Sequence, residues 1–195
     1  MPIIYLHGFR SNHLSEKAVL TQTACLEHHI PFACPDLDAE PQQAIAQIQE
    51  IVTQKQWHWS DILLIGSSLG GFYARYLANE HGCRAVFVNP CVFATRDLST
   101  QLHHKKAFNG VDDFIFKPHF LIQLQQLFVK TLHHPEQHLL FVGQSDEVLN
   151  WREMLWMNQG VNTIIKANDT HRFESYSNYL ADIIKAYQNG FFTCK

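Results

Sequence analysis

The apolar positions of the chain form two kinds of pattern that alternate. Short continuous apolar runs, typical of strands buried on both faces of a parallel sheet, predict strands at residues 2–6, 31–37, 62–65, 85–88, 139–143 and 162–166. Between them, apolar positions recur every three or four residues and predict helices within 12–29 and over 41–52, 72–78, 119–132, 148–158 and 176–187. Six strands alternating with helices predict an α/β fold, a mostly parallel sheet covered by helices on both faces.

Residues 91–136 interrupt this alternation. They contain no strong strand pattern, but they include the amphipathic run at 119–132. We expect this segment to be a small helical cap insertion over the strand ends. At 195 residues the chain is expected to form one domain, 1–195, with the cap inside it.

Composition excludes several classes of protein. A net charge of −3 gives no reason to expect nucleic acid or an acidic membrane as a partner. The start of the chain lacks the basic and apolar regions of a signal peptide, and no run approaches the roughly 18 apolar residues of a membrane helix. We therefore expect a cytoplasmic protein. The five cysteines and 13 histidines lack the spacing of a disulfide framework or a metal site, so no metal is expected.

One stretch carries a motif of covalent catalysis. Gly66-Ser67-Ser68-Leu69-Gly70 is a G-x-S-x-G sequence that directly follows a predicted strand and precedes a predicted helix. In a nucleophile elbow the chain turns sharply between such elements, and small residues on either side of the serine leave room for the turn. Ser68 is thus the candidate nucleophile. The alternative is an ordinary strand-to-helix turn or a phosphate-binding loop, with Ser68 as a helix N-cap.

A serine nucleophile needs a base, and the base needs an acid that orients it. On this kind of fold the order is serine, acid, histidine. Asp146 follows the predicted strand at 139–143, and His171 lies between the last strand and the last helix, so we assign these two as acid and base. Glu147 is an alternative acid, whereas Asp169 is too close in sequence to His171 for easy contact with its inner ring nitrogen. Taken singly, Asp146 could equally cap the following helix, and His171 could be a loop residue.

Acyl transfer also requires donors for an oxyanion. On this fold they are the backbone N–H after the nucleophile and one from the loop after the first strand, which correspond to Leu69 and Phe9. Gly8 would allow the close turn before Phe9, and His7 is interpreted as a structural hydrogen-bonding side chain.

Substrate contacts are predicted at three positions. Arg10 lies beside the proposed oxyanion site and could meet an anionic group of the substrate, or it could be a solvated loop arginine. The aromatic residues of the cap are candidates for an acyl pocket or for plain core, and Phe93 and Phe116 are selected among them. The others are Phe108, Phe114 and Phe120.

Several segments together resemble a known family. These are Tyr5-Leu6-His7-Gly8-Phe9 with Ser11, Ser15 and Lys17-Ala18, the elbow Gly66-Ser67-Ser68-Leu69-Gly70-Gly71-Phe72-Tyr73-Ala74, Asn89-Pro90, and Thr170-His171-Arg172-Phe173. The chain resembles, over nearly its whole length, the small YqiA-like esterases of the α/β-hydrolase superfamily. The resemblance implies a reduced α/β-hydrolase fold and matches Ser68, Asp146 and His171 to nucleophile, acid and base. It also implies hydrolysis of a small-molecule carboxylic ester or acyl thioester without a cofactor. The chain departs from the expected pattern at residues 10–13 and 168–170, which affects substrate preference more than chemistry.

The sequence is compatible with two classes of function. The leading interpretation is a serine esterase or thioesterase that works through an acyl-enzyme. The other is a catalytically silent α/β-hydrolase fold that binds a ligand or a protein. Lactone or amide hydrolysis would use the same residues.

Overall fold

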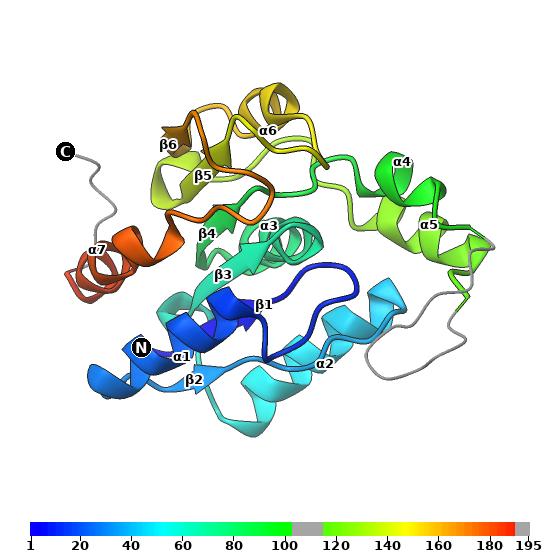
Figure 1. Cartoon of the computed structure of the whole chain (residues 1–195). Helices are drawn as coiled ribbons and strands as arrows, with labels where there is room; N and C mark the ends of the chain where they lie inside the picture. Colours follow the sequence, from blue (N-terminus) through cyan, green and yellow to red (C-terminus); the bar gives the residue numbers. More distant parts are fainter. Residues whose placement is uncertain (103–114, 190–195) are drawn as a thin grey trace.

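The computed structural model describes residues 1–102 and 115–189, in which six strands form one sheet (Figure 1). The strands are β1 (Ile3–Leu6), β2 (Phe32–Ala33), β3 (Leu63–Ser67), β4 (Arg84–Val88), β5 (Leu139–Gly143) and β6 (Asn162–Lys166). Their order in the sheet is β2-β1-β3-β4-β5-β6, and every neighbouring pair is parallel. The predicted α/β fold is confirmed.

Helices cover both faces of this sheet. They are α1 (Glu16–Glu27), α2 (Pro41–Gln54), α3 (Leu69–His81), α4 (Ala94–Ser99), α5 (Pro118–Gln126), α6 (Trp151–Met157) and α7 (Tyr176–Gln188), with short 3₁₀ turns η1 (Trp59–Asp61) and η2 (Pro135–Gln137). Helices α1 and α7 lie on one face, and α2, α3 and α6 lie on the other (Figure 1). None of the helices within residues 1–102 and 115–189 is long and apolar enough to cross a membrane.

The side chains of the strands alternate between two apolar cores. In β1, Ile3 and Tyr5 belong to the core under α1 and α7, whereas Ile4 and Leu6 belong to the core under α2 and α3. All four are at most 1% exposed. Burial on both faces explains why the strands show continuous apolar runs instead of an alternation with polar residues.

The connection from β4 to β5 carries the cap. Helices α4 and α5 pack against each other there, and α5 also contacts α2. Residues 103–114 of the predicted insertion lie outside the described ranges, and Phe108 and Phe114 lie outside them too. Cap helices on an otherwise regular sheet agree with the reduced α/β-hydrolase fold expected from the sequence.

The strand order places a crevice next to β1 and β3. After β1 the chain forms β2, which pairs with one edge of β1, and then β3, which pairs with the opposite edge of β1. The connections leaving β1 and β3 therefore diverge, and open α/β sheets bind ligands outside the carboxyl ends of strands at such a switch point. Gly8 and Ser68 both lie at this edge.

Three elements are shorter than predicted, and one of them is α5, which ends at Gln126 instead of residue 132. Strand β2 has two residues instead of residues 31–37, and Pro31 and Pro35 on either side of it have no N–H to donate to a neighbour. Helix α6 begins at Trp151 instead of residue 148, because Asp146 accepts the N–H groups of Val148 and Leu149 in a separate turn. The side chain of Asn150 then caps the helix.

Candidate active site

Ser68 occupies a strained turn between β3 and α3. Its backbone angles are φ 55° and ψ −119°, a region that residues with a Cβ rarely adopt. The turn is held by its own backbone: the Ser68 N–H donates to the Val88 carbonyl at 3.0 Å, and its carbonyl accepts from Gly71 and Cys91 at 2.9 and 3.0 Å. The side chain is therefore fixed at the edge of the sheet, as in a nucleophile elbow.

The two glycines of the motif are required by close backbone approaches. A Cβ on Gly66 would lie 2.2 Å from the Gly70 carbonyl oxygen, and a Cβ on Gly70 would lie 2.0 Å from the Leu6 carbonyl oxygen. Both distances are far below van der Waals contact, and the neighbouring atoms are backbone that cannot move independently. The G-x-S-x-G pattern thus follows from how tightly β1, β3 and α3 pack.

We expect Gly70→Ala to lower the free energy of unfolding by about 3 kcal/mol, because the added methyl group forces β1 and α3 apart. Gly82→Ala is the matched control. Gly82 has φ 68° but has no atom within 4 Å of an added Cβ, so only the left-handed conformation costs energy, about 1 kcal/mol. Urea unfolding of both variants measures the difference. Equal losses would show that the contact with Leu6 is not what requires glycine.

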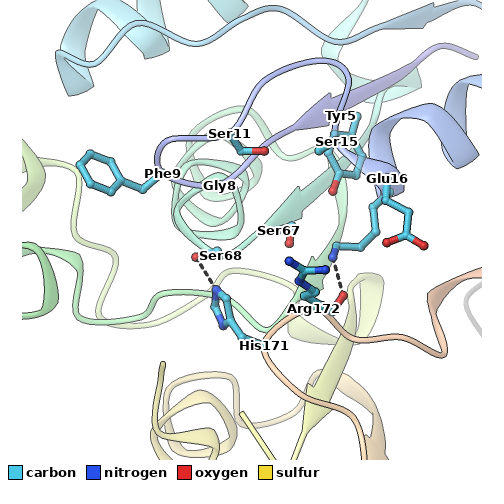
Figure 2. A pocket seen from close by; sticks show the side chains of 11 residues that line it. Tyr5, Gly8, Phe9, Ser11, Ser15, Glu16, Ser67, Ser68, His171 and Arg172 are labelled. Carbon is cyan, nitrogen blue, oxygen red and sulfur yellow. Dashed lines mark hydrogen bonds between the residues drawn. The ribbon is translucent and has the colours of Figure 1, made fainter. Parts of the chain in front are cut away.

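A chain of hydrogen bonds connects Ser68 to two other side chains. Nε2 of His171 lies 3.1 Å from Oγ of Ser68 (Figure 2), and Nδ1 of His171 lies 2.8 Å from Oδ2 of Asp146. The Asp146 side chain is fully buried, and that of His171 is 21% exposed. Oδ1 of Asp146 accepts from the N–H groups of Val148 and Leu149, both at 2.8 Å. One carboxylate oxygen thus fixes the loop while the other faces the imidazole.

The two other carboxylates near His171 have different positions. Oε2 of Glu147 accepts the backbone N–H of His171 at 3.0 Å, so it contacts the loop and not the ring. Asp169 accepts from the N–H and the hydroxyl of Ser175, at 3.0 and 2.9 Å, and thereby holds the start of α7. Of the three carboxylates, only Asp146 bonds to the imidazole.

Asn89 joins the two loops that carry Asp146 and His171. It is fully buried and has φ 41°. Its Nδ2 donates to the carbonyls of Thr170 and His171 at 2.8 and 3.2 Å, and its Oδ1 accepts the N–H of Gly143 at 2.7 Å. Asn89-Pro90 is one of the segments that resemble the family, but the sequence predicted no role for Asn89. The signal in the sequence that could have found it was an asparagine directly after a buried strand.

The loop after β1 passes next to Ser68. A Cβ on Gly8 would lie 3.2 Å from the Cβ of Ser68, so this position leaves little room for a side chain. His7 is 2% exposed; its Nε2 accepts the Leu37 N–H at 2.9 Å, and its Nδ1 therefore carries the proton donated to the Gly8 carbonyl. Burial lowers the pKa of His7, in keeping with a neutral ring. His7 holds the shape of the loop.

Two pockets include Ser68 and His171 among their lining residues. The α1 pocket, of about 400 Å³, is polar and lies toward the start of α1 (Figure 2). It is lined by Tyr5, Gly8, Phe9, Ser11, Ser15, Glu16, Lys17, Ser67, Ser68, His171 and Arg172. The α4 pocket, of about 700 Å³, is lined by Phe9, Arg10, Ser68, Leu69, Cys91, Arg96, Asp97, Leu98, Thr100, Gln101, Val148, Leu149 and His171.

The predicted substrate contacts differ in their positions. Arg10 lines the α4 pocket. Phe116 is 1% exposed and packs edge-on against Phe9, with ring centroids 5.8 Å apart, so it lies behind a lining residue. Phe93 stacks on Phe128 at 6.2 Å and is not among the described residues that line either pocket. Neither phenylalanine is brought to the pockets beside Ser68. Aromatic composition alone could not separate lining residues from packing residues.

Metal ligands are not gathered anywhere in the described part of the chain. Within residues 1–102 and 115–189, no three His, Cys, Asp or Glu side chains lie where they could hold an ion.

Solved structures with the same fold are α/β hydrolases. Mouse alpha/beta hydrolase domain-containing protein 10 superposes with a TM-score of 0.76 at 15% identity, covering 96% of this chain and 89% of that one. Est1E from Butyrivibrio proteoclasticus, with ferulic acid bound, gives 0.71 at 14% identity, with 97% and 88% covered. The esterase domain of a Rhodothermus marinus protein gives 0.68 at 18% identity, with 95% and 86% covered. At these identities the likeness establishes the fold.

A family match covers nearly the whole chain. Residues 2–188 match the group described as Uncharacterised protein family (UPF0227), which confirms the YqiA-like resemblance noted in the sequence. The chain therefore belongs to the UPF0227 family and has the α/β-hydrolase fold.

Proposed function

We propose that the chain is a serine hydrolase that cleaves carboxylic esters or acyl thioesters through a covalent acyl-enzyme. The observation that carries the proposal is the continuous hydrogen-bonded chain from Ser68 through His171 to the buried carboxylate of Asp146. It begins on a strained turn and opens onto two pockets. An isolated helix-capping serine would need none of these features.

The geometry supports a two-stage reaction. Nε2 of His171 accepts the hydroxyl proton while Oγ of Ser68 attacks the carbonyl carbon, and Asp146 stabilises the imidazolium that forms. When the tetrahedral intermediate collapses, the bond to the leaving group breaks, and the imidazolium returns the proton to that group. A water molecule then gives a proton to His171 and attacks the acyl-enzyme. As the bond to Oγ of Ser68 breaks, the imidazolium returns the proton to Oγ and the acid leaves.

The oxyanion of the intermediate is assigned to the N–H groups of Leu69 and Phe9. Leu69 is the first residue of α3, so its N–H lies at the positive end of the helix dipole. Phe9 follows Gly8, which lies close against Ser68, and both Phe9 and Leu69 line the α4 pocket with Ser68. Donors from these two loops act on developing charge in a site partly shielded from water.

The competing function is a catalytically silent fold that binds a ligand. A silent fold has no requirement for a nucleophile, base and acid in hydrogen-bond contact, and here all three are in contact. Hydrolysis of lactones or amides would use the same machinery, so substrate class has to be decided by experiment.

We expect the purified protein to hydrolyse p-nitrophenyl butyrate, with kcat/KM far above the rate of spontaneous hydrolysis. A panel of p-nitrophenyl esters, acyl thioesters, lactones and anilides, measured under the same conditions, identifies the class that it prefers. Esters or thioesters should give the highest kcat/KM. A folded protein that hydrolyses none of the panel would favour the binding function.

A further inference from the structure

We propose that the substrate carries a carboxylate in its acyl chain and that Arg10 binds it. This inference rests on the proposed function and adds the substrate class. It follows from an unpaired guanidinium in the α4 pocket, the larger of the two pockets that Ser68 and His171 line.

Arg10 is held in the pocket without a polar partner. Its Nε and Nη2 atoms are buried, and neither has a hydrogen-bond partner among the described residues. The guanidinium carbon lies 5.1 Å from the centroid of the Phe9 ring, which supports it from one side. Burying charged donors without acceptors is unfavourable, so a site of this kind is suited to a ligand that supplies the acceptors.

The backbone keeps Arg10 close to the reacting atoms. Arg10 has φ 57°, a left-handed conformation that non-glycine residues seldom adopt. It lies two residues after Gly8, at which an added Cβ would be 3.2 Å from the Cβ of Ser68. The Ser11 N–H bonds back to the Gly8 carbonyl at 3.2 Å, which closes the turn around Phe9 and Arg10. The guanidinium is thus attached to the same tight loop that contributes to the proposed oxyanion site.

The other arginine that lines the α4 pocket is paired with carboxylates. Arg96 forms ion pairs with Asp97 at 2.8 Å and with Glu153 at 2.6 Å. These carboxylates raise the pKa of Arg96, which stays charged and paired. Among the described lining residues, Arg10 is therefore the cation whose charge no carboxylate offsets.

A single unpaired guanidinium favours a singly charged carboxylate over a phosphate. A phosphate carries up to two negative charges, whereas Arg10 supplies one positive charge. A carboxylate matches the planar fork of the guanidinium and requires one positive charge. The apolar parts of the wall, including Leu98 and Leu149, suit the methylene groups between that carboxylate and the scissile carbonyl.

The test compares two esters of similar chain length, p-nitrophenyl hydrogen glutarate and p-nitrophenyl pentanoate, in which a methyl group replaces the carboxylate. We expect the wild-type protein to show a higher kcat/KM for the glutarate ester, after correction for spontaneous hydrolysis. In Arg10→Gln the ratio of the two kcat/KM values should fall by about 10- to 100-fold, the range for loss of a charged hydrogen bond. Using the ratio removes any general loss of activity from a disturbed loop.

Arg152→Gln is the matched control, because Arg152 is an exposed arginine that lies over the Trp151 ring and lines neither pocket. Its ratio should equal that of the wild type. Equal kcat/KM values for the two esters, unchanged in Arg10→Gln, would contradict this inference and leave the proposed function standing. A folded wild type that hydrolyses neither ester would contradict the proposed function as well.

A second pair of substrates separates carboxylate from phosphate recognition. Butyryl-CoA and butyrylpantetheine share the thioester, but only the former carries the nucleotide phosphates. We expect Arg10→Gln to leave the ratio of their kcat/KM values unchanged. If the substitution instead lowers this ratio and not the glutarate ratio, Arg10 binds a phosphate in the leaving group and the proposal of an acyl carboxylate is wrong.

Discussion

Ser68→Ala is expected to lower kcat/KM for p-nitrophenyl butyrate by about 10³- to 10⁶-fold, since it removes the atom that forms the acyl-enzyme. The expected loss is large because His171 and Asp146 act only through the Ser68 oxygen. The substitution removes one hydroxyl group from a turn whose hydrogen bonds are made by backbone atoms, so the fold should be preserved. Circular dichroism and steady-state kinetics measure the two effects separately.

Ser67→Ala is the control for this prediction. Ser67 is the preceding residue of the same motif, it is the last residue of β3, and it makes no hydrogen bond to His171. We expect a much smaller loss, because the elbow geometry and the chain of hydrogen bonds stay in place. A loss of kcat/KM in Ser67→Ala as large as that in Ser68→Ala would contradict the assignment of Ser68 as the nucleophile.

Asp146→Asn is expected to lower kcat by about 10⁴-fold. The buried carboxylate accepts from Nδ1 of His171, which leaves Nε2 unprotonated and facing Ser68. An amide can place its NH₂ group toward Nδ1 instead, which favours the wrong tautomer, and it carries no charge to stabilise the imidazolium. Kinetics with p-nitrophenyl butyrate measures the loss, and a pH profile shows whether the titration of the base has changed.

Glu147→Gln tests whether Glu147, rather than the neighbouring Asp146, is the acid. Glu147 accepts the backbone N–H of His171, and a glutamine oxygen can accept the same bond. The expected loss in kcat is therefore no more than about tenfold, since one charge-assisted hydrogen bond becomes a neutral one. Small and equal losses in Asp146→Asn and Glu147→Gln would remove Asp146 from the role of acid.

Much of this architecture was predictable because local sequence determines it. Runs such as residues 139–143 are apolar on both faces, which a central parallel strand requires and few other elements do. The glycines around Ser68 are fixed by contacts within a few residues and with the adjacent β1 strand. Ser68, Asp146 and His171 each follow a strand, so the parallel direction of the strands was enough to bring them to one edge of the sheet.

Contacts between distant loops were harder to predict. The role of Asn89 depends on Gly143 and Thr170, which are brought to it only by the pairing of β4 with β5 and of β5 with β6. Phe93 and Phe116 show the same difficulty, because the choice between lining a pocket and packing behind it depends on the direction of each side chain. Asp146 accepts the N–H groups of Val148 and Leu149, so α6 begins later than helical periodicity predicts.

The most direct measurement is mass spectrometry of the protein after reaction with a fluorophosphonate probe, which phosphonylates activated serine residues. We predict one adduct per chain, located by fragmentation on Ser68, and none in Ser68→Ala. The adduct should form much more slowly in His171→Gln, because glutamine cannot take the hydroxyl proton. A folded wild-type protein that stays unlabelled, or that carries the adduct on another residue, would contradict the assignment of Ser68 as an activated nucleophile.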